Sequence, residues 1–343
     1  MNVIDQRKLP FEFKVFEIQS AEDAYFAIRY MVVRGAQLIG VTASYGIYLA
    51  GFHSRADEWQ TDLQEAGELL LSSRPSVSNL RYTVAKMLGG VNFAGSRRGM
   101  IERLEHMANR MAESEVLRCR EIGNHGLTLI KEMYKEKGRT INVLMYCNAG
   151  WLSSVDYGTA TAPIFLAHDQ GIPLHIWVDE TRPRNLDARL TTFELREQGV
   201  PHTVIIENEV GHRMQKGEVD MVLVGSDHIT PAGDVVAKVG TYMKALAARD
   251  NGIPFYVALA STPLDGRNGK RDGSKVEHAQ DNKREEKRLI CDRLRIMKRG
   301  DEGLSPDFDI TPAHMVTGLI TERGLCDASE SAIKSLFRNS III

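Results

Sequence analysis

Apolar residues recur three and four positions apart along most of residues 21–137, which is the spacing of amphipathic helices. The clearest examples are residues 21–33, 63–73, 77–88 and 100–134. Before them, the chain allows only a short hairpin over residues 11–18. The pattern therefore predicts a mostly helical N-terminal domain over residues 1–125.

After residue 139, short apolar runs rich in β-branched residues alternate with helical stretches. The runs are residues 141–147, 174–180, 202–208, 220–227 and 254–260. Strand and helix alternating at this spacing are typical of βαβ units around a buried parallel sheet. We therefore expect an α/β fold in which a Rossmann-like parallel-sheet domain, residues 126–343, follows the helical domain.

Composition and charge narrow the class of protein. The chain has 343 residues, of which 43% are hydrophobic and 26% charged, as in soluble globular proteins. Its formal charge of −2 offers no general field for nucleic acid or an anionic membrane. The N-terminus has no secretory pattern, and the apolar stretch 31–52 is interrupted by Arg34 and glycines. We expect a cytoplasmic protein with no nucleic-acid or membrane partner.

Two further features concern metals and interaction surfaces. The four cysteines are scattered without a CxxC pair, so the sequence predicts neither a disulfide framework nor a metal site. Residues 264–300 are strongly charged and include a candidate basic amphipathic helix. We interpret this segment as a solvated surface helix or excursion in preference to a nucleic-acid or partner site.

Polar side chains follow every predicted strand, where ligands bind in an open parallel sheet. They are Cys147, Asp179 with Glu180, Glu207 with Asn208, Asp227, and Ser261 with Thr262. From position alone Cys147 is either a buried space-filling thiol or a reactive group. Asp227 either caps the following turn or exchanges protons, since an acid at the end of an apolar strand loses water and its pKa should rise.

Small, donor-rich segments and two arginines suggest a phosphate site. Residues 148–150 and 157–160 can present backbone N–H groups at a strand-to-helix junction. Arg34 and Arg74 each lie next to turn residues and could clamp a phosphate, although most arginines are simply solvated. The chain lacks the GxGxxG, P-loop, GxSxG and HExxH motifs, which disfavours nicotinamide-dependent, NTPase, serine-hydrolase and zinc-protease chemistry.

Several sequence blocks resemble those of a known family and occur in the same order along the chain. The blocks are VRGAQLIGVTASYG (33–46), SSRPSVSNL (72–80), CNAGWLSSVDYGTA (147–160), VDETRPRNLDARLTTFEL (178–195), KGEVDMVLVGSDHI (216–229), GDVVAKVGTY (233–242) and FDITPAHMVTGLITERG (308–324). The chain resembles the methylthioribose-1-phosphate isomerases and, more broadly, ribose-1,5-bisphosphate isomerase and the regulatory subunits of translation initiation factor 2B. The resemblance covers nearly the whole chain.

The resemblance implies a homodimer, with no metal or organic cofactor, that converts an aldose 1-phosphate to the ketose 1-phosphate. It implies Cys147 and Asp227 as the catalytic pair. Asp227 would exchange a proton with the ring oxygen or the C2 hydroxyl, and Cys147 would act as base at C2 or stabilise the transition state. The family's phosphate and sugar contacts match Arg34, Gly35, Ala36, Arg74 and Lys238.

The chain departs from the family pattern near the substrate. Leu186-Asp187 stands where the family has Gln-Gly, and Ala237 replaces an Asn before the lysine. Trp151 replaces a small residue, and Phe193 stands near the position of the usual Trp. A lost polar partner weakens discrimination for a hydroxyl. Both 5-methylthioribose 1-phosphate and 5-deoxyribose 1-phosphate therefore remain candidate substrates.

The sequence leaves two other functions open. One is a non-catalytic regulatory or scaffold protein like the initiation-factor subunits. The other is a sugar-phosphate sensor that binds without reacting. The joint presence of Cys147, Asp227 and the three cationic residues favours an enzyme, because a scaffold has no need of a thiol and a carboxyl at the strand ends.

Overall fold

A computed structural model describes residues 1–55, 58–75, 77–91, 96–146, 148–181, 185–260, 306 and 308–338. Cys147, Ser261, Thr262 and the charged segment 264–300 lie outside the described residues. The side chain of Leu186 is likewise not described.

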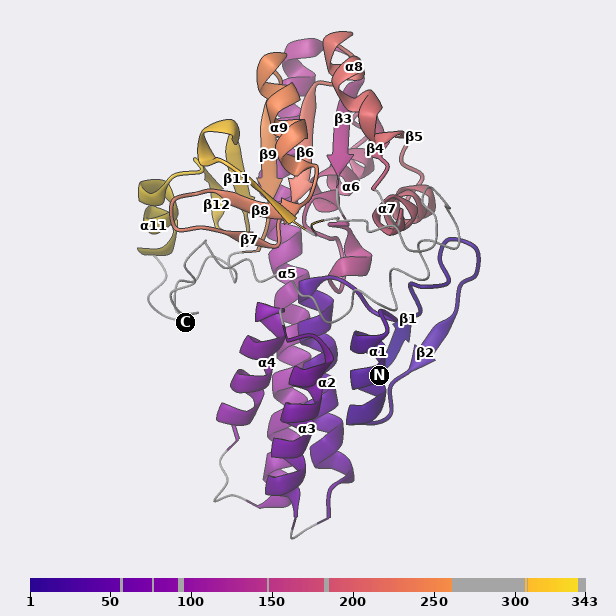
Figure 1. Cartoon of the computed structure of the whole chain (residues 1–343), viewed down its shortest axis with the longest axis vertical. Helices are drawn as coiled ribbons and strands as arrows, with labels where there is room; N and C mark the ends of the chain where they lie inside the picture. Colours follow the sequence, from indigo (N-terminus) through magenta and orange to yellow (C-terminus); the bar gives the residue numbers. More distant parts are fainter. Residues whose placement is uncertain are drawn as a thin grey trace, which may run out of the picture.

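The N-terminal helices pack around a common apolar core (Figure 1). They are α1 (Ala21–Arg29), α2 (Ala36–His53), α3 (Trp59–Ser73), α4 (Ser78–Gly89) and α5 (Arg97–Lys137). Ile28, Ile47, Leu63 and Leu80 are fully buried there. Burial of each such side chain stabilises the fold by about 1.5–3 kcal/mol. The helical pattern predicted over residues 21–137 is confirmed. No described helix is both long enough and apolar enough to span a bilayer.

The short hairpin expected over residues 11–18 is wrong in its pairing. Strand β2 (Val15–Glu17) does form, but its antiparallel partner is β1 (Asn2–Ile4), with Val3 opposite Phe16. Val3 is buried, so pairing with the N-terminus places an apolar side chain in the core. A hairpin within residues 11–18 would have left that surface exposed.

Helix α5 connects the helical bundle to the sheet. Its first half buries Met100 and Leu104 in the bundle core, and its second half buries Ile122 and Ile130 against the sheet. Figure 1 shows the helix running from the bundle up behind the strands. Residue 125 lies inside α5, so the division proposed there cuts through one continuous helix.

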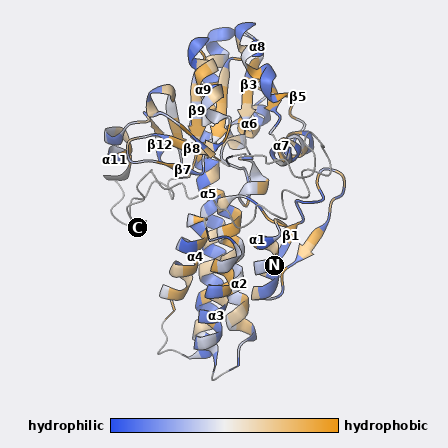
Figure 2. Ribbon diagram, in the orientation of Figure 1, coloured by the Kyte–Doolittle hydropathy of each residue, from blue (hydrophilic) through white to orange (hydrophobic). Residues whose placement is uncertain are grey.

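Seven strands form the large sheet, in the order β12-β11-β9-β6-β3-β4-β5. All neighbouring pairs are parallel except β11 with β12. The strands are β3 (Ile141–Tyr146), β4 (Leu174–Asp179), β5 (His202–Ile205), β6 (Met221–Gly225), β9 (Phe255–Ala258), β11 (Gly318–Thr321) and β12 (Gly324–Cys326). The central strands are apolar (Figure 2), as expected when helices cover both faces. The five predicted strand runs are confirmed as parallel strands.

The other elements of this half cover the sheet or extend it. The helices are α6 (Thr161–Asp169), α7 (Leu186–Glu197), α8 (Val210–Gln215), α9 (Thr241–Asp250) and α11 (Glu330–Arg338), with short 3₁₀ turns at Trp151–Ser153, Glu207–Glu209 and Ala313–Met315. A small sheet has the order β10-β8-β7, from β7 (His228–Ile229), β8 (Val235–Lys238) and β10 (Phe308–Thr311). It follows β6 in the chain and carries Lys238 at the end of β8.

The strand order has a reversal point between β3 and β6. From β3 the chain adds β4 and β5 on one side, then returns to place β6 and β9 on the other. In open parallel sheets, ligands bind beyond the carboxyl ends of the strands at such a reversal. Cys147 is the residue after β3, and Asp227 lies two residues after β6. The topology therefore brings the end of β3, which precedes Cys147 in the sequence, to the same edge of the sheet as Asp227.

Candidate active site

Asp227 follows β6 and lies near several charged side chains. The residue is exposed at the surface, but protein atoms around its carboxyl partly exclude water, and this desolvation together with the negative charge of Asp187 raises its pKa to about 6. Lys238, Arg74 and Arg34 act in the opposite direction. The expected rise in the pKa of Asp227 is confirmed. A carboxyl with a pKa near neutrality is suited to proton transfer at physiological pH.

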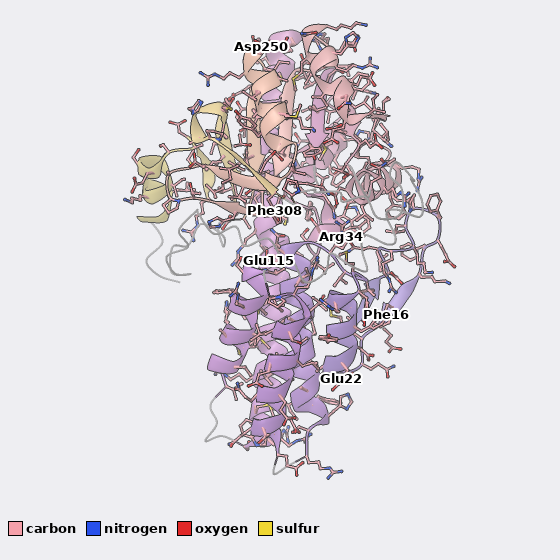
Figure 3. All side chains as sticks on the ribbon, in the orientation of Figure 1. Phe16, Glu22, Arg34, Glu115, Asp250 and Phe308 are labelled. Carbon is pink, nitrogen blue, oxygen red and sulfur yellow. The ribbon has the colours of Figure 1, made fainter. Side chains whose placement is uncertain are left out.

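The three candidate phosphate-binding cations come from distant parts of the chain. Arg34 lies between α1 and α2, Arg74 ends α3, and Lys238 ends β8. All three are close enough for their charge to act on the Asp227 carboxyl. Arg34 lies where the bundle meets the sheet (Figure 3). The structure thus gathers four of the predicted side chains in one electrostatic environment.

Gly35 and Ala36 form the start of α2 beside the turn that follows β3. Gly35 has a φ of 90°, and a Cβ there would lie 2.1 Å from the carbonyl oxygen of Ser153. Only glycine fits this approach. Asn79 Nδ2 donates to the Ala36 carbonyl at 2.7 Å, which ties α4 to the same loop. The first N–H groups of a helix favour an anion, so this end of α2 suits a phosphate near Arg34.

The two small, donor-rich segments that follow Cys147 in the sequence, residues 148–150 and 157–160, lie side by side. The Ala149 carbonyl accepts hydrogen bonds from the backbone N–H groups of Thr159 at 2.8 Å and Ala160 at 3.1 Å. Gly158 approaches Gly150 so closely that a Cβ would lie 2.4 Å from the Gly150 carbonyl carbon. Asn148 Oδ1 is buried and has no hydrogen-bond partner among the described residues. The turn therefore leaves one polar atom available for a ligand.

Glu194 holds this turn in place from α7, a role that sequence reasoning missed. It is fully buried, and its carboxyl accepts the backbone N–H groups of Trp151 at 2.9 Å and Leu152 at 3.0 Å. Burial raises its pKa to about 8, although these two hydrogen bonds favour the ionised form. The helical spacing of α7 marks position 194 as inward-facing, but a glutamate there gives no sign of its partners 42 and 43 residues away.

Glu194→Gln is expected to destabilise the protein at pH 5 and to lose part of that disadvantage by pH 9. The amide leaves one buried N–H without an acceptor, at a cost of about 1–3 kcal/mol. In the wild type the native carboxyl binds its proton more tightly than the unfolded one. Stability from this group is therefore full below the ordinary glutamate pKa of 4.5 and is lost as pH rises towards 8.

Urea unfolding at pH 5, 7 and 9 measures this difference. Glu197→Gln is the matched control, because Glu197 is on the same helix but exposed. A difference between Glu194→Gln and wild type that does not change with pH would contradict the assignment.

Asp187, in the first turn of α7, contacts two of the predicted phosphate-binding cations. Its Oδ1 accepts from Arg34 Nη2 at 3.0 Å, and its Oδ2 accepts from Lys238 Nζ. The sequence marks this residue as a departure from the family pattern but gives no partner for it. Burial alone would raise the pKa of Asp187, but the two cations outweigh burial and hold it below its ordinary value.

The remaining strand-end acids form a separate cluster. Lys244, on α9, lies 2.8 Å from Asp179 Oδ2 and 3.4 Å from Glu207 Oε1, and its ammonium lies over the Tyr146 ring. Burial, together with Glu207 and Glu180, raises the pKa of Asp179 to about 7 despite Lys244. The hydroxyl of Tyr146 donates to the Val239 carbonyl, next to Lys238. This buried cluster therefore supports the ends of β3 and β8.

Trp151 and Phe193, two departures from the family pattern, contact each other. Their ring centroids are 6.3 Å apart, and both pack with Leu152 and Leu190. Position 151 thus carries a larger side chain than the family pattern, and position 193, which it contacts, carries a smaller one. Ala237 is fully buried in the apolar core around β6 and α9. In this chain that position serves packing.

The described residues hold no cluster of metal ligands. Among them, no three His, Cys, Asp or Glu side chains gather as they would around an ion. The polar groups that converge near Asp227 are instead three cations and two carboxyls, a set suited to a phosphorylated substrate.

A family model and curated relatives both match most of this chain. The model of the initiation factor 2 subunit family matches residues 32–328. Methylthioribose-1-phosphate isomerases from Methylorubrum populi and Desulfatibacillum aliphaticivorans are each 46% identical, over 98% of this chain and 93% of their own length.

Two solved structures share the whole architecture. The 5-methylthioribose 1-phosphate isomerase of Pyrococcus horikoshii has a TM-score of 0.87 and 30% identity, covering 99% of this chain and 93% of its own. A structure described as translation initiation factor eIF-2B, subunit delta, from A. fulgidus has a TM-score of 0.85 and 34% identity, covering 98% of this chain and 96% of its own.

Proposed function

The chain belongs to the initiation factor 2 subunit family, and on that premise we propose that it is an aldose–ketose isomerase of the methylthioribose-1-phosphate isomerase type. Its substrate is a 5-substituted ribose 1-phosphate, either 5-methylthioribose or 5-deoxyribose 1-phosphate, and its product is the ribulose 1-phosphate. The observation that carries this proposal is the environment of Asp227: a carboxyl of raised pKa, at the strand reversal, among three cations.

The cations and the start of α2 would hold the phosphate. Arg34 keeps a buried Nη1 with no hydrogen-bond partner among the described residues, and Lys238 approaches from the small sheet. Guanidinium and ammonium groups bind phosphate oxygens with strong, charge-assisted hydrogen bonds. A phosphate held there places the rest of the sugar within reach of the strand ends.

The reaction requires a proton to move to and from oxygen while a hydrogen moves from C2 to C1. The phosphate on the anomeric oxygen locks the ring, so the ring must open before C2 can become a ketone. Asp227, with its raised pKa, can give a proton to the ring oxygen and accept one from the C2 hydroxyl. Cys147 would act at C2, as base or by stabilising the transition state. The oxidation of C2 balances the reduction of C1.

The substrate is identified by comparing related sugars. Steady-state kcat/KM values are measured by NMR for ribose 1-phosphate, its 5-methylthio and 5-deoxy analogues, and ribose 1,5-bisphosphate. We expect one of the two analogues to give the highest value, because the chain is 46% identical to methylthioribose-1-phosphate isomerases. A preference for the bisphosphate would contradict this substrate class.

A regulatory or sensor protein is the second candidate, favoured by the similarity to the A. fulgidus protein. A sensor binds a sugar phosphate without converting it, whereas a regulatory scaffold need not bind one. Saturation-transfer signals from the same NMR samples distinguish these functions from that of an isomerase. Binding without conversion of any sugar would favour the sensor, and absence of binding would favour a scaffold.

We also propose a homodimer. Large apolar side chains are exposed on α9 and on the adjacent strand β10: Met243, Leu246, Phe308 and Ile310. Grouped apolar surface of this kind is typical of association sites. Sedimentation equilibrium checks the proposal, since a single species at monomer mass would contradict it.

A further inference from the structure

Asp187 places a negative charge on the groups that are proposed to bind the substrate phosphate. Its side chain is only 5% exposed and contacts both Arg34 and Lys238. It lies in the first turn of α7, where the helix dipole also favours an anion. One buried carboxylate thus engages two cations from the helical bundle and from the small sheet.

We propose that Asp187 is an internal anion that competes with the substrate phosphate for Arg34 and Lys238. This inference rests on the proposed function, which assigns those two cations to the phosphate. Two anions cannot share the same cations at contact distance without strong repulsion. A phosphate that binds the unpartnered Nη1 of Arg34 and the ammonium of Lys238 must therefore displace Asp187 or lie beside it against the repulsion of its negative charge.

The charge balance shows the direction of the effect. Arg34, Lys238 and Asp187 together carry a formal charge of +1, whereas a neutral residue at position 187 would leave +2. Buried charge pairs are expensive to break because each separated group is left without its partner. A ligand held by its phosphate alone bears this whole cost. A sugar phosphate offsets the cost through contacts of its sugar.

The competition also acts on Asp227. The charge of Asp187 disfavours ionisation of the Asp227 carboxyl and so contributes to its raised pKa. Asp187 itself stays ionised near neutrality, because its cationic partners hold its pKa low. The groups facing Asp227 are thus Asp187 on α7, Lys238 on β8, and Arg74 and Arg34 from the bundle. Without the charge at position 187, the strongest remaining charges that act on Asp227 are cationic.

The test is the affinity of the wild type and of Asp187→Asn for inorganic phosphate, measured by titration calorimetry at pH 8. Asparagine keeps the shape of the side chain and removes its charge. We expect the dissociation constant to fall about tenfold or more in the variant. Asp187→Gly introduces the residue of the family pattern and should act in the same direction, which provides a second reading if the asparagine variant folds poorly.

Asp220→Asn is the matched control. Asp220 is also a buried aspartate with two cationic partners, Arg139 and Lys137, but it precedes β6 at the opposite edge of the sheet. Its variant should bind phosphate as the wild type does. Unchanged or weaker phosphate affinity in the Asp187 variants, or an equal gain in Asp220→Asn, would overturn the proposal.

A second readout separates competition from a structural role. In Asp187→Asn the alkaline limb of the kcat/KM profile should move to lower pH, because Asp227 must carry the proton that it gives to the ring oxygen and loses that proton more easily once its negative neighbour is gone. A kcat/KM profile with the same pH dependence as the wild type would contradict the effect of Asp187 on Asp227. Absence of turnover in the wild type would overturn the proposed isomerase while the phosphate titration still decided the role of Asp187.

Discussion

An asparagine in place of Asp227 is expected to lower kcat/KM by about 10²- to 10⁴-fold, the range that a positioned proton-transfer group contributes. Asparagine keeps the size of the side chain but cannot give and take a proton at this position. Arg34 and Lys238, which are proposed to bind the phosphate, are both held by Asp187, so sugar-phosphate binding should persist without the Asp227 carboxyl. The measurement is kcat/KM by NMR, with binding followed by saturation transfer.

The same variant should be more stable than the wild type above pH 6 and equally stable at pH 4. The folded pKa of Asp227, about 6, lies above its ordinary value of 3.8, so the native state loses stability as pH rises through that window. Asparagine removes this loss. Thermal unfolding at pH 4, 6 and 8 checks the sign.

Asp250→Asn provides the control, because Asp250 is exposed at the far end of the molecule (Figure 3). It should change neither activity nor pH dependence. Activity of Asp227→Asn within tenfold of the wild type would remove Asp227 from the chemistry.

The second large effect is expected for Cys147→Ser, which should lower kcat by at least about 10²-fold. Serine preserves the size of the side chain but replaces a readily ionised thiol with a hydroxyl of much higher pKa. The described neighbours of Cys147 in the sequence lie at the edge already described, since Tyr146 ends β3 and the turn from Asn148 onwards lies beside Thr159. Single-turnover kinetics with saturating substrate measure the effect on the chemical step.

Cys119→Ser is the matched control for a cysteine without a chemical role. Cys119 is fully buried in α5, and burial raises the pKa of its thiol to about 12. It should neither react with iodoacetamide nor affect turnover. Alkylation that inactivates the wild type, is prevented by substrate and maps to Cys147 would support the assignment. Full activity of Cys147→Ser would exclude it.

Local pattern predicted the elements well because their periodicity reflects burial. The helical spacing in residues 21–137 and the β-branched runs after residue 139 correspond to the bundle and to the parallel strands. The desolvation that raises the pKa of Asp227 was also predictable, because an acid at the end of an apolar strand loses water, but the contribution of Asp187 was not. The helical and strand patterns depend on residues close together in the chain.

Contacts between distant segments could not be predicted in the same way. Arg34 and Asp187 are 153 residues apart, and neither sequence neighbourhood indicates the other. The short strands β7, β8 and β10 carry too few residues for a pattern, although together they position Lys238. In the sequence, Trp151 and Phe193 are two separate departures from the family pattern. Only the contact between their rings shows that the two departures are related.

The most direct measurement follows a mixture of 5-methylthioribose 1-phosphate and 5-deoxyribose 1-phosphate by ¹³C NMR, with purified wild type and with Asp227→Asn at equal concentration. The account predicts that a ketone carbon appears at C2 of at least one sugar with the wild type and of neither with the variant. Unchanged spectra of both sugars with the wild type, or equal conversion by the two proteins, would contradict it.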